Sequence, residues 1–72
     1  PPLPVISGRQ CVKALEKIGF LTARQTGSHI ILRRADPPTT LPVPDHKELA
    51  PGTLRSIIRQ AGLSVAEFIA LL

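Results

Sequence analysis

The chain has 72 residues, with nine Lys and Arg against five Asp and Glu and a net charge of +4. This length leaves no room for a second domain and argues against a large enclosed active-site cavity. Its apolar runs are far shorter than the roughly 20 residues that cross a bilayer, and its charge suits an anionic partner or simple solubility.

The N-terminal residues 1–6 lack the basic start and the apolar stretch of a secretory signal. We expect them to form a tail that precedes a single domain at residues 7–72. The one cysteine, Cys11, cannot form an internal disulfide and lies among apolar helical positions, which predicts a buried thiol. A chain without disulfides is typical of the reducing cytoplasm, so we expect a cytoplasmic protein without membrane contact.

A capping-box pattern predicts the first helix. Ser7 is followed three residues later by Gln10, a spacing at which hydroxyl and amide satisfy backbone donors at a helix start. We therefore expect a helix that begins near Gly8. Gly19 suits its end, because glycine readily adopts the left-handed conformation of a helix cap.

Two extended segments then predict a hairpin. Residues 20–25 have an extended pattern, and residues 28–34 are rich in β-branched and long side chains. Thr26 and Gly27 lie between them, and a glycine that can take a positive φ is typical of a tight turn. These segments are therefore expected to pair as antiparallel strands.

The third extended segment, residues 39–44, contains two prolines. Pro42 and Pro44 are two positions apart, so their missing N–H groups face the same side of the strand. A strand tolerates such a row only at the edge of a sheet. We therefore predict an edge strand.

Two more helices are expected after the sheet. Pro51 suits the first turn of a helix, where its missing donor is not needed, and Gly62 suits the end of that helix. A second capping box, Ser64 with Glu67, predicts a last helix whose apolar spacing continues to Leu72. The order of helix, three antiparallel strands and two helices indicates an α+β fold, with one face of the sheet open to a ligand.

Three stretches of the chain resemble a known family: QTGSHI at residues 25–30, TLPVP at 40–44 and ELAPGTLRSIIRQAGLS at 48–64. In order and spacing they are similar to HicA toxins, over nearly the whole chain from Ser7 onward. The resemblance implies a fold like the double-stranded RNA-binding domain. It also implies an mRNA-cleaving activity in a prokaryotic toxin-antitoxin pair, and a HicB-type antitoxin as the partner protein.

The same resemblance places the catalytic histidine at His29, after the glycine turn of Gly27 and Ser28. Many members of the family carry a second histidine where this chain has Ile30. Strand alternation puts His29 on the face opposite Ile30 and Leu32, which we assign to the core. Without the resemblance, an ordinary half-exposed strand histidine would be the commoner interpretation.

The chemistry of RNA cleavage suits a histidine. RNA carries its own nucleophile, so an enzyme must remove the 2′-hydroxyl proton, stabilise charge on the phosphate and protonate the leaving oxygen. Imidazole titrates near cellular pH and can pass protons in both directions. We therefore predict a metal-independent endoribonuclease that uses His29 for acid-base catalysis.

Several other residues are candidates for RNA binding. The basic candidates could pair with phosphate oxygens; they are Arg24, Arg33, Lys47, Arg55 and Arg59. Ser28 is a further candidate contact, but it has no base arranged to make it a nucleophile. His46 is more simply interpreted as a polar loop residue, although it could assist proton transfer. Two histidines and one cysteine lack the number and spacing of a zinc site, so we expect no metal or cofactor.

Two other functions stay open. The chain could be a non-catalytic RNA-binding module, although it lacks a dense lysine cluster at the start of the predicted Pro51 helix. It could also be a protein-interaction domain whose basic face meets an acidic partner. With two Phe and no Trp or Tyr, the chain offers little base stacking, so RNA binding would be mainly electrostatic.

Overall fold

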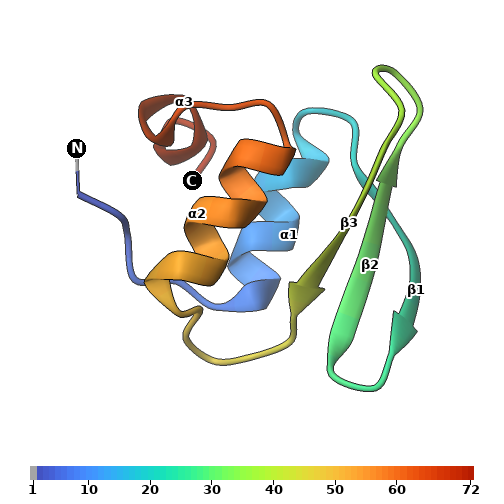
Figure 1. Cartoon of the computed structure of the whole chain (residues 1–72), viewed down its shortest axis with the longest axis horizontal. Coiled ribbons are helices and arrows are strands. Elements are labelled where there is room, and N and C mark those ends of the chain that lie inside the picture. The colour runs from blue at the N-terminus through green and yellow to red at the C-terminus, as the bar shows by residue number, and fades with distance from the viewer. Residues whose placement is uncertain (1) are drawn as a thin grey trace.

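A three-stranded antiparallel sheet lies beside the helices of the computed structural model, which describes residues 2–72 (Figure 1). The elements in chain order are α1 (Gly8–Glu16), β1 (Leu21–Thr26), β2 (His29–Arg34), β3 (Thr39–Pro44), α2 (Pro51–Gln60) and α3 (Val65–Ile69). The α+β architecture predicted from the sequence is confirmed. The strand order is β1-β2-β3, which places the proline-bearing β3 at an edge as predicted.

The helix boundaries follow from local sequence signals. Both capping boxes are present, since the hydroxyls of Ser7 and Ser64 each accept a backbone N–H three residues later at 3.1 Å. The last helix is shorter than predicted: the apolar spacing predicted a helix to Leu72, whereas α3 ends at Ile69. Beyond it, the N–H of Leu72 donates to the carbonyl three residues earlier, which is the tighter pattern of a terminal turn rather than a continued α-helix.

The hairpin of β1 and β2 turns at Gly27 and Ser28. Gly27 has a φ of 59°, the left-handed conformation that glycine adopts without steric cost. Thr26 pairs with His29 across this turn, and the register shifts farther along, between Thr22 and Arg24, where β1 carries a bulge. His29 is therefore the first residue of β2, directly after the turn.

The core lies on the inner face of β2 and β3. The sheet contributes buried Ile30, Leu32, Leu41 and Val43, and the helices contribute residues that include Cys11, Leu15, Leu54, Ile57, Ile58 and Phe68. All of β1 is exposed. Burial raises the pKa of the Cys11 thiol to about 12, in agreement with the buried cysteine predicted from the sequence.

The N-terminal segment contributes to this core as well. Ile6 is buried, and its carbonyl accepts the N–H of Leu49 at 2.9 Å. Leu3 packs against the same cluster. The division into a tail at residues 1–6 and a domain at 7–72 stays a prediction, and within that tail Ile6 packs as a core residue.

Arg34 connects the sheet to the C-terminal end of α2. Its guanidinium carbon lies 4.4 Å from the centre of the Phe20 ring, and Nη2 donates to the carbonyl of Ala61 at 3.3 Å. A cation near the last carbonyls of a helix also interacts favourably with the negative end of the helix dipole, and a cation above an aromatic ring is attracted to it. Arg34 therefore helps to hold α2 beside the sheet.

The start of α1 lies directly against the end of β3. The N–H of Gly8 donates to the carbonyl of His46 at 2.9 Å. A Cβ atom on Gly8 would overlap the backbone carbonyl oxygen of Pro44. Because both partners are backbone atoms, neither can move aside cheaply, and this position requires glycine.

We expect Gly8→Ala to lower the free energy of unfolding by roughly 1–3 kcal/mol, the usual cost of overpacking. Gly52→Ala is the matched control, because a Cβ at Gly52 meets nothing within 4 Å. Alanine in a helix is favoured over glycine, so this control should gain up to about 1 kcal/mol. Urea unfolding followed by circular dichroism measures both, and equal midpoints for Gly8→Ala and wild type would contradict the close contact.

Candidate active site

An open groove of about 420 Å³ lies between β3 and α2. Its lining residues are His29, Pro42, Pro44, Gly52, Thr53, Ser56, Ile57 and Gln60. Pro42 and Pro44 pair with Ile31 and His29 of β2, so they share the outer face of the sheet, opposite the core. The groove therefore combines outer-face residues of the sheet with one side of α2.

His29 is the first residue of β2 and is exposed. The residues that alternate with it, Ile30 and Leu32, are buried at 4% and 0% exposure. The outer face predicted for His29 is thus confirmed. Its catalytic role stays a prediction, but its imidazole lies where a ligand in the groove can reach it.

Arg24 is the basic candidate that the sheet register brings nearest to His29. Arg24 pairs with Ile31, and His29 pairs with Thr26, so Arg24 and His29 are diagonal neighbours on the outer face. Such diagonal neighbours are separated by about 7–8 Å. Arg33 shares this face but lies four residues farther along β2, or about 13 Å at 3.3 Å per residue.

The remaining RNA-binding candidates are exposed and do not line the groove. Lys47 is in the loop between β3 and α2, and Arg55 and Arg59 are on a side of α2 outside the groove. Ser28 is in the hairpin turn, where its carbonyl accepts the N–H of Asp45 at 2.6 Å. This contact is made by the backbone, so it agrees with the interpretation of Ser28 as a turn residue and leaves its side chain uninvolved.

The sequence analysis missed the α2 side of the groove. Gly52, Ser56 and Gln60 are spaced four residues apart and therefore share one side of the helix. Gln60 Nε2 donates to Ser56 Oγ at 3.0 Å. This small and polar stripe was visible in the sequence beside the apolar stripe, but only the contact of α2 with β3 shows that it lines a groove.

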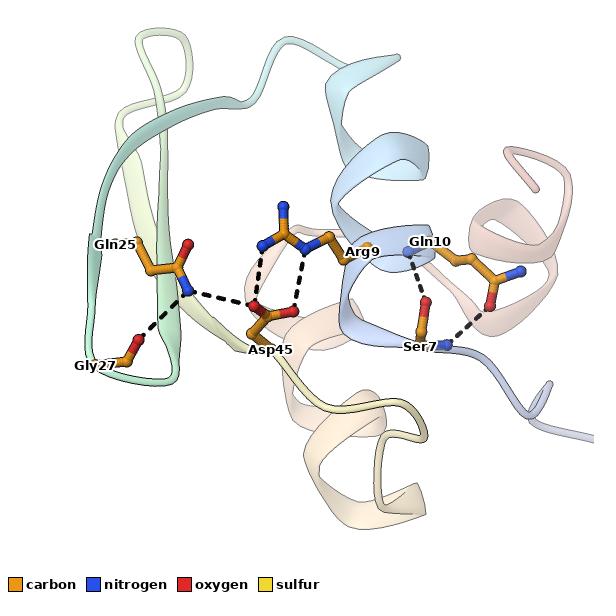
Figure 2. Close-up of polar contacts among 6 residues, drawn as sticks. All are labelled: Ser7, Arg9, Gln10, Gln25, Gly27 and Asp45. Atoms are coloured by element: carbon orange, nitrogen blue, oxygen red, sulfur yellow. Dashed lines mark hydrogen bonds and ion pairs between the residues drawn. The ribbon is translucent and has the colours of Figure 1, made fainter.

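Asp45 fixes the end of the groove where His29 lies. Arg9 donates to both carboxylate oxygens, from Nε at 3.1 Å and from Nη2 at 3.0 Å. Gln25 donates to the same carboxylate at 3.3 Å and to the carbonyl of Gly27 at 3.4 Å (Figure 2). Asp45, the residue that follows β3, is thus linked to α1, β1 and the hairpin turn. The hydrogen bonds from Arg9 lower the pKa of the Asp45 carboxyl below its ordinary value.

Between residues 2 and 72, no group of three or more His, Cys, Asp or Glu side chains could hold a metal ion. Over the same range, the helices are too short or too polar to cross a membrane.

Comparison with known proteins identifies a family. Residues 8–63 match the family model described as HicA toxin of bacterial toxin-antitoxin, which covers well over half of the chain. The match includes His29, the groove and the Asp45 contacts. A search of the curated proteins gave no match.

We expect Asp45→Asn to lower the urea midpoint at about pH 7, because the variant loses the charge that pairs with Arg9. A carboxyl whose folded-state pKa is depressed stabilises the fold above its unfolded-state pKa of about 3.9. That contribution is lost as the pH falls through the lower folded-state pKa. The difference between the two midpoints should therefore shrink below about pH 4.

Urea titrations at several pH values test this dependence. Asp36→Asn, in the exposed turn between β2 and β3, is the matched control and should give a small difference. Midpoints for Asp45→Asn that equal those of wild type near neutral pH would show that the Asp45 contacts do not stabilise the fold.

Proposed function

The chain belongs to the HicA family of toxins from bacterial toxin-antitoxin systems, and we propose that it cleaves mRNA without a metal ion. Membership of a toxin-antitoxin family implies an antitoxin as partner, and we propose that this antitoxin is of the HicB type and that both proteins are cytoplasmic. The observation that supports cleavage is the exposed imidazole of His29, which lies on the outer face of the sheet and lines the groove between β3 and α2.

The reaction that fits this site is an internal transesterification. His29 accepts the proton of a ribose 2′-hydroxyl, and the 2′-oxygen forms a bond to the adjacent phosphorus. The bond from phosphorus to the 5′-oxygen breaks, which gives a 2′,3′-cyclic phosphate and a 5′-hydroxyl end. Because the groove is open, the leaving oxygen can take its proton from water.

Phosphate binding is assigned first to Arg24. It is the diagonal neighbour of His29 on the outer face, and a guanidinium can pair with two phosphate oxygens at once. Ser28, which directly precedes His29, is a further proposed contact close to the cleaved bond. The other proposed contacts would hold the RNA farther away; they are Arg33, Lys47, Arg55 and Arg59. The net charge of +4 favours the approach of RNA to the protein.

We expect His29→Ala to lower the rate of RNA cleavage by at least about 100-fold, the usual contribution of general acid-base catalysis. The urea midpoint should change little, because the side chain is exposed. The measurement is cleavage of a fluorescent single-stranded RNA in EDTA, with the 2′,3′-cyclic phosphate end identified by mass spectrometry. His46→Ala is the control, since His46 lies in a loop outside the groove.

Each outcome of this experiment has a distinct meaning. Equal cleavage by wild type and His29→Ala would overturn the catalytic role of His29. Cleavage that EDTA abolishes would overturn the metal-independent reaction. Salt-sensitive binding of RNA without cleavage by wild type would favour the non-catalytic RNA-binding module.

A further inference from the structure

The groove beside His29 is neutral over most of its surface. Within the part of the chain that the structure describes, its lining consists of histidine, proline, glycine, threonine, serine, isoleucine and glutamine. Away from His29, a phosphate in the groove would lose water contacts and gain no cation in return, which is costly. The groove therefore suits an uncharged part of a nucleotide, whereas Arg24 lies outside it on the open face.

The two sides of the groove differ in chemistry. Pro42 and Pro44 of β3 present ring surfaces, and Ile57 adds an apolar contact from α2. Thr53, Ser56 and Gln60 provide hydroxyl and amide groups. A nucleobase has the same division, with apolar faces and polar edges. The volume of about 420 Å³ lies within the range of about 300–1,000 Å³ that small-molecule sites have.

Ser56 and Gln60 form a defined pair of hydrogen-bonding groups. One amide hydrogen of Gln60 is donated to Ser56 Oγ at 3.0 Å. The serine hydroxyl hydrogen, the second amide hydrogen and the amide oxygen of Gln60 then stay available to a ligand. A side-chain amide that offers a donor and an acceptor together can pair with the edge of one base and reject another.

We infer that this groove binds one unpaired nucleobase of the RNA, and that Ser56 and Gln60 select which base it accepts. The inference rests on the proposed function, because it identifies the part of the substrate that the groove holds. His29 and Pro44 are paired residues in the sheet, so the imidazole lies next to one wall of the groove, within reach of the ribose and phosphate attached to a bound base.

Two consequences follow for the substrate. A base that is stacked in an A-form duplex cannot enter the groove, so the substrate is single-stranded at this nucleotide. The groove also replaces the aromatic platforms on which other proteins stack bases. Both phenylalanines, Phe20 and Phe68, are fully buried, and the chain has no Trp or Tyr.

The first test is cleavage of a randomised single-stranded RNA pool, with the ends of the products sequenced. Wild type should show a base preference at one position next to the cut. Gln60→Glu replaces an amide donor with an acceptor and should change that preference at least about fivefold. Gln60→Ala should weaken it by a similar factor. Glu16→Gln, on the exposed side of α1, is the control and should leave the preference unchanged.

The second test measures binding without cleavage. His29→Ala, labelled with 15N, is titrated with a single-stranded trinucleotide in an NMR experiment. We expect the largest shifts at the Gln60 side-chain amide and at the backbone amides of Thr53 and Ser56. Adding Gly52→Ala should weaken binding several-fold without loss of stability, because its methyl group occupies open space in the groove.

The two tests separate this inference from the proposed function. Cleavage that depends on His29 but keeps the same base preference in both Gln60 variants would overturn base selection alone. NMR shifts confined to the surface around Arg24 and Arg33 would overturn the base site. Shifts at Gln60 in His29→Ala, together with a wild-type protein that does not cleave RNA, would support the base site and reject the ribonuclease.

Discussion

The end of β3 is held by backbone and side-chain contacts that meet within a few residues. The backbone of Gly8 lies against the carbonyl of Pro44, and the next residue, Asp45, receives Arg9 and Gln25 on its carboxylate. The N–H of Asp45 also donates to the carbonyl of Ser28 in the hairpin turn. α1, the turn and β3 are therefore fixed relative to one another at the point where His29 begins β2. The groove depends on this junction, because the loop to α2 starts there.

The prolines of β3 have two structural effects. Without N–H groups they cannot extend the sheet, so β3 is an edge strand. Pro42 and Pro44 also form one apolar wall of the groove, and Ile57 of α2 lines it from the other side. The prolines that keep β3 at the edge of the sheet therefore also form part of the surface that a ligand in the groove contacts.

The sequence predicts those parts of the molecule that local interactions determine. Capping boxes, turn glycines and strand alternation are short-range, and they correctly placed the helix starts, the hairpin and the outer face of His29. The predicted length of α3 was wrong, because the last two residues of the chain form hydrogen bonds over three residues in place of the four of an α-helix. The α2 side of the groove could not be predicted, because it depends on how α2 packs beside β3. Ser56 and Gln60 enter the site through that packing, whereas Arg33 lies about 13 Å along the strand from His29.

The bulge between Thr22 and Arg24 has a consequence for the other edge of the sheet. β1 is exposed along its whole length, and a straight strand of this kind would serve as a template for pairing with another copy of the chain. The bulge bends the strand and interrupts its ladder, and Arg24 adds a charge at the same place. With prolines at one margin and a bulge at the other, the sheet stops at three strands, and edge-to-edge self-association is opposed on both sides.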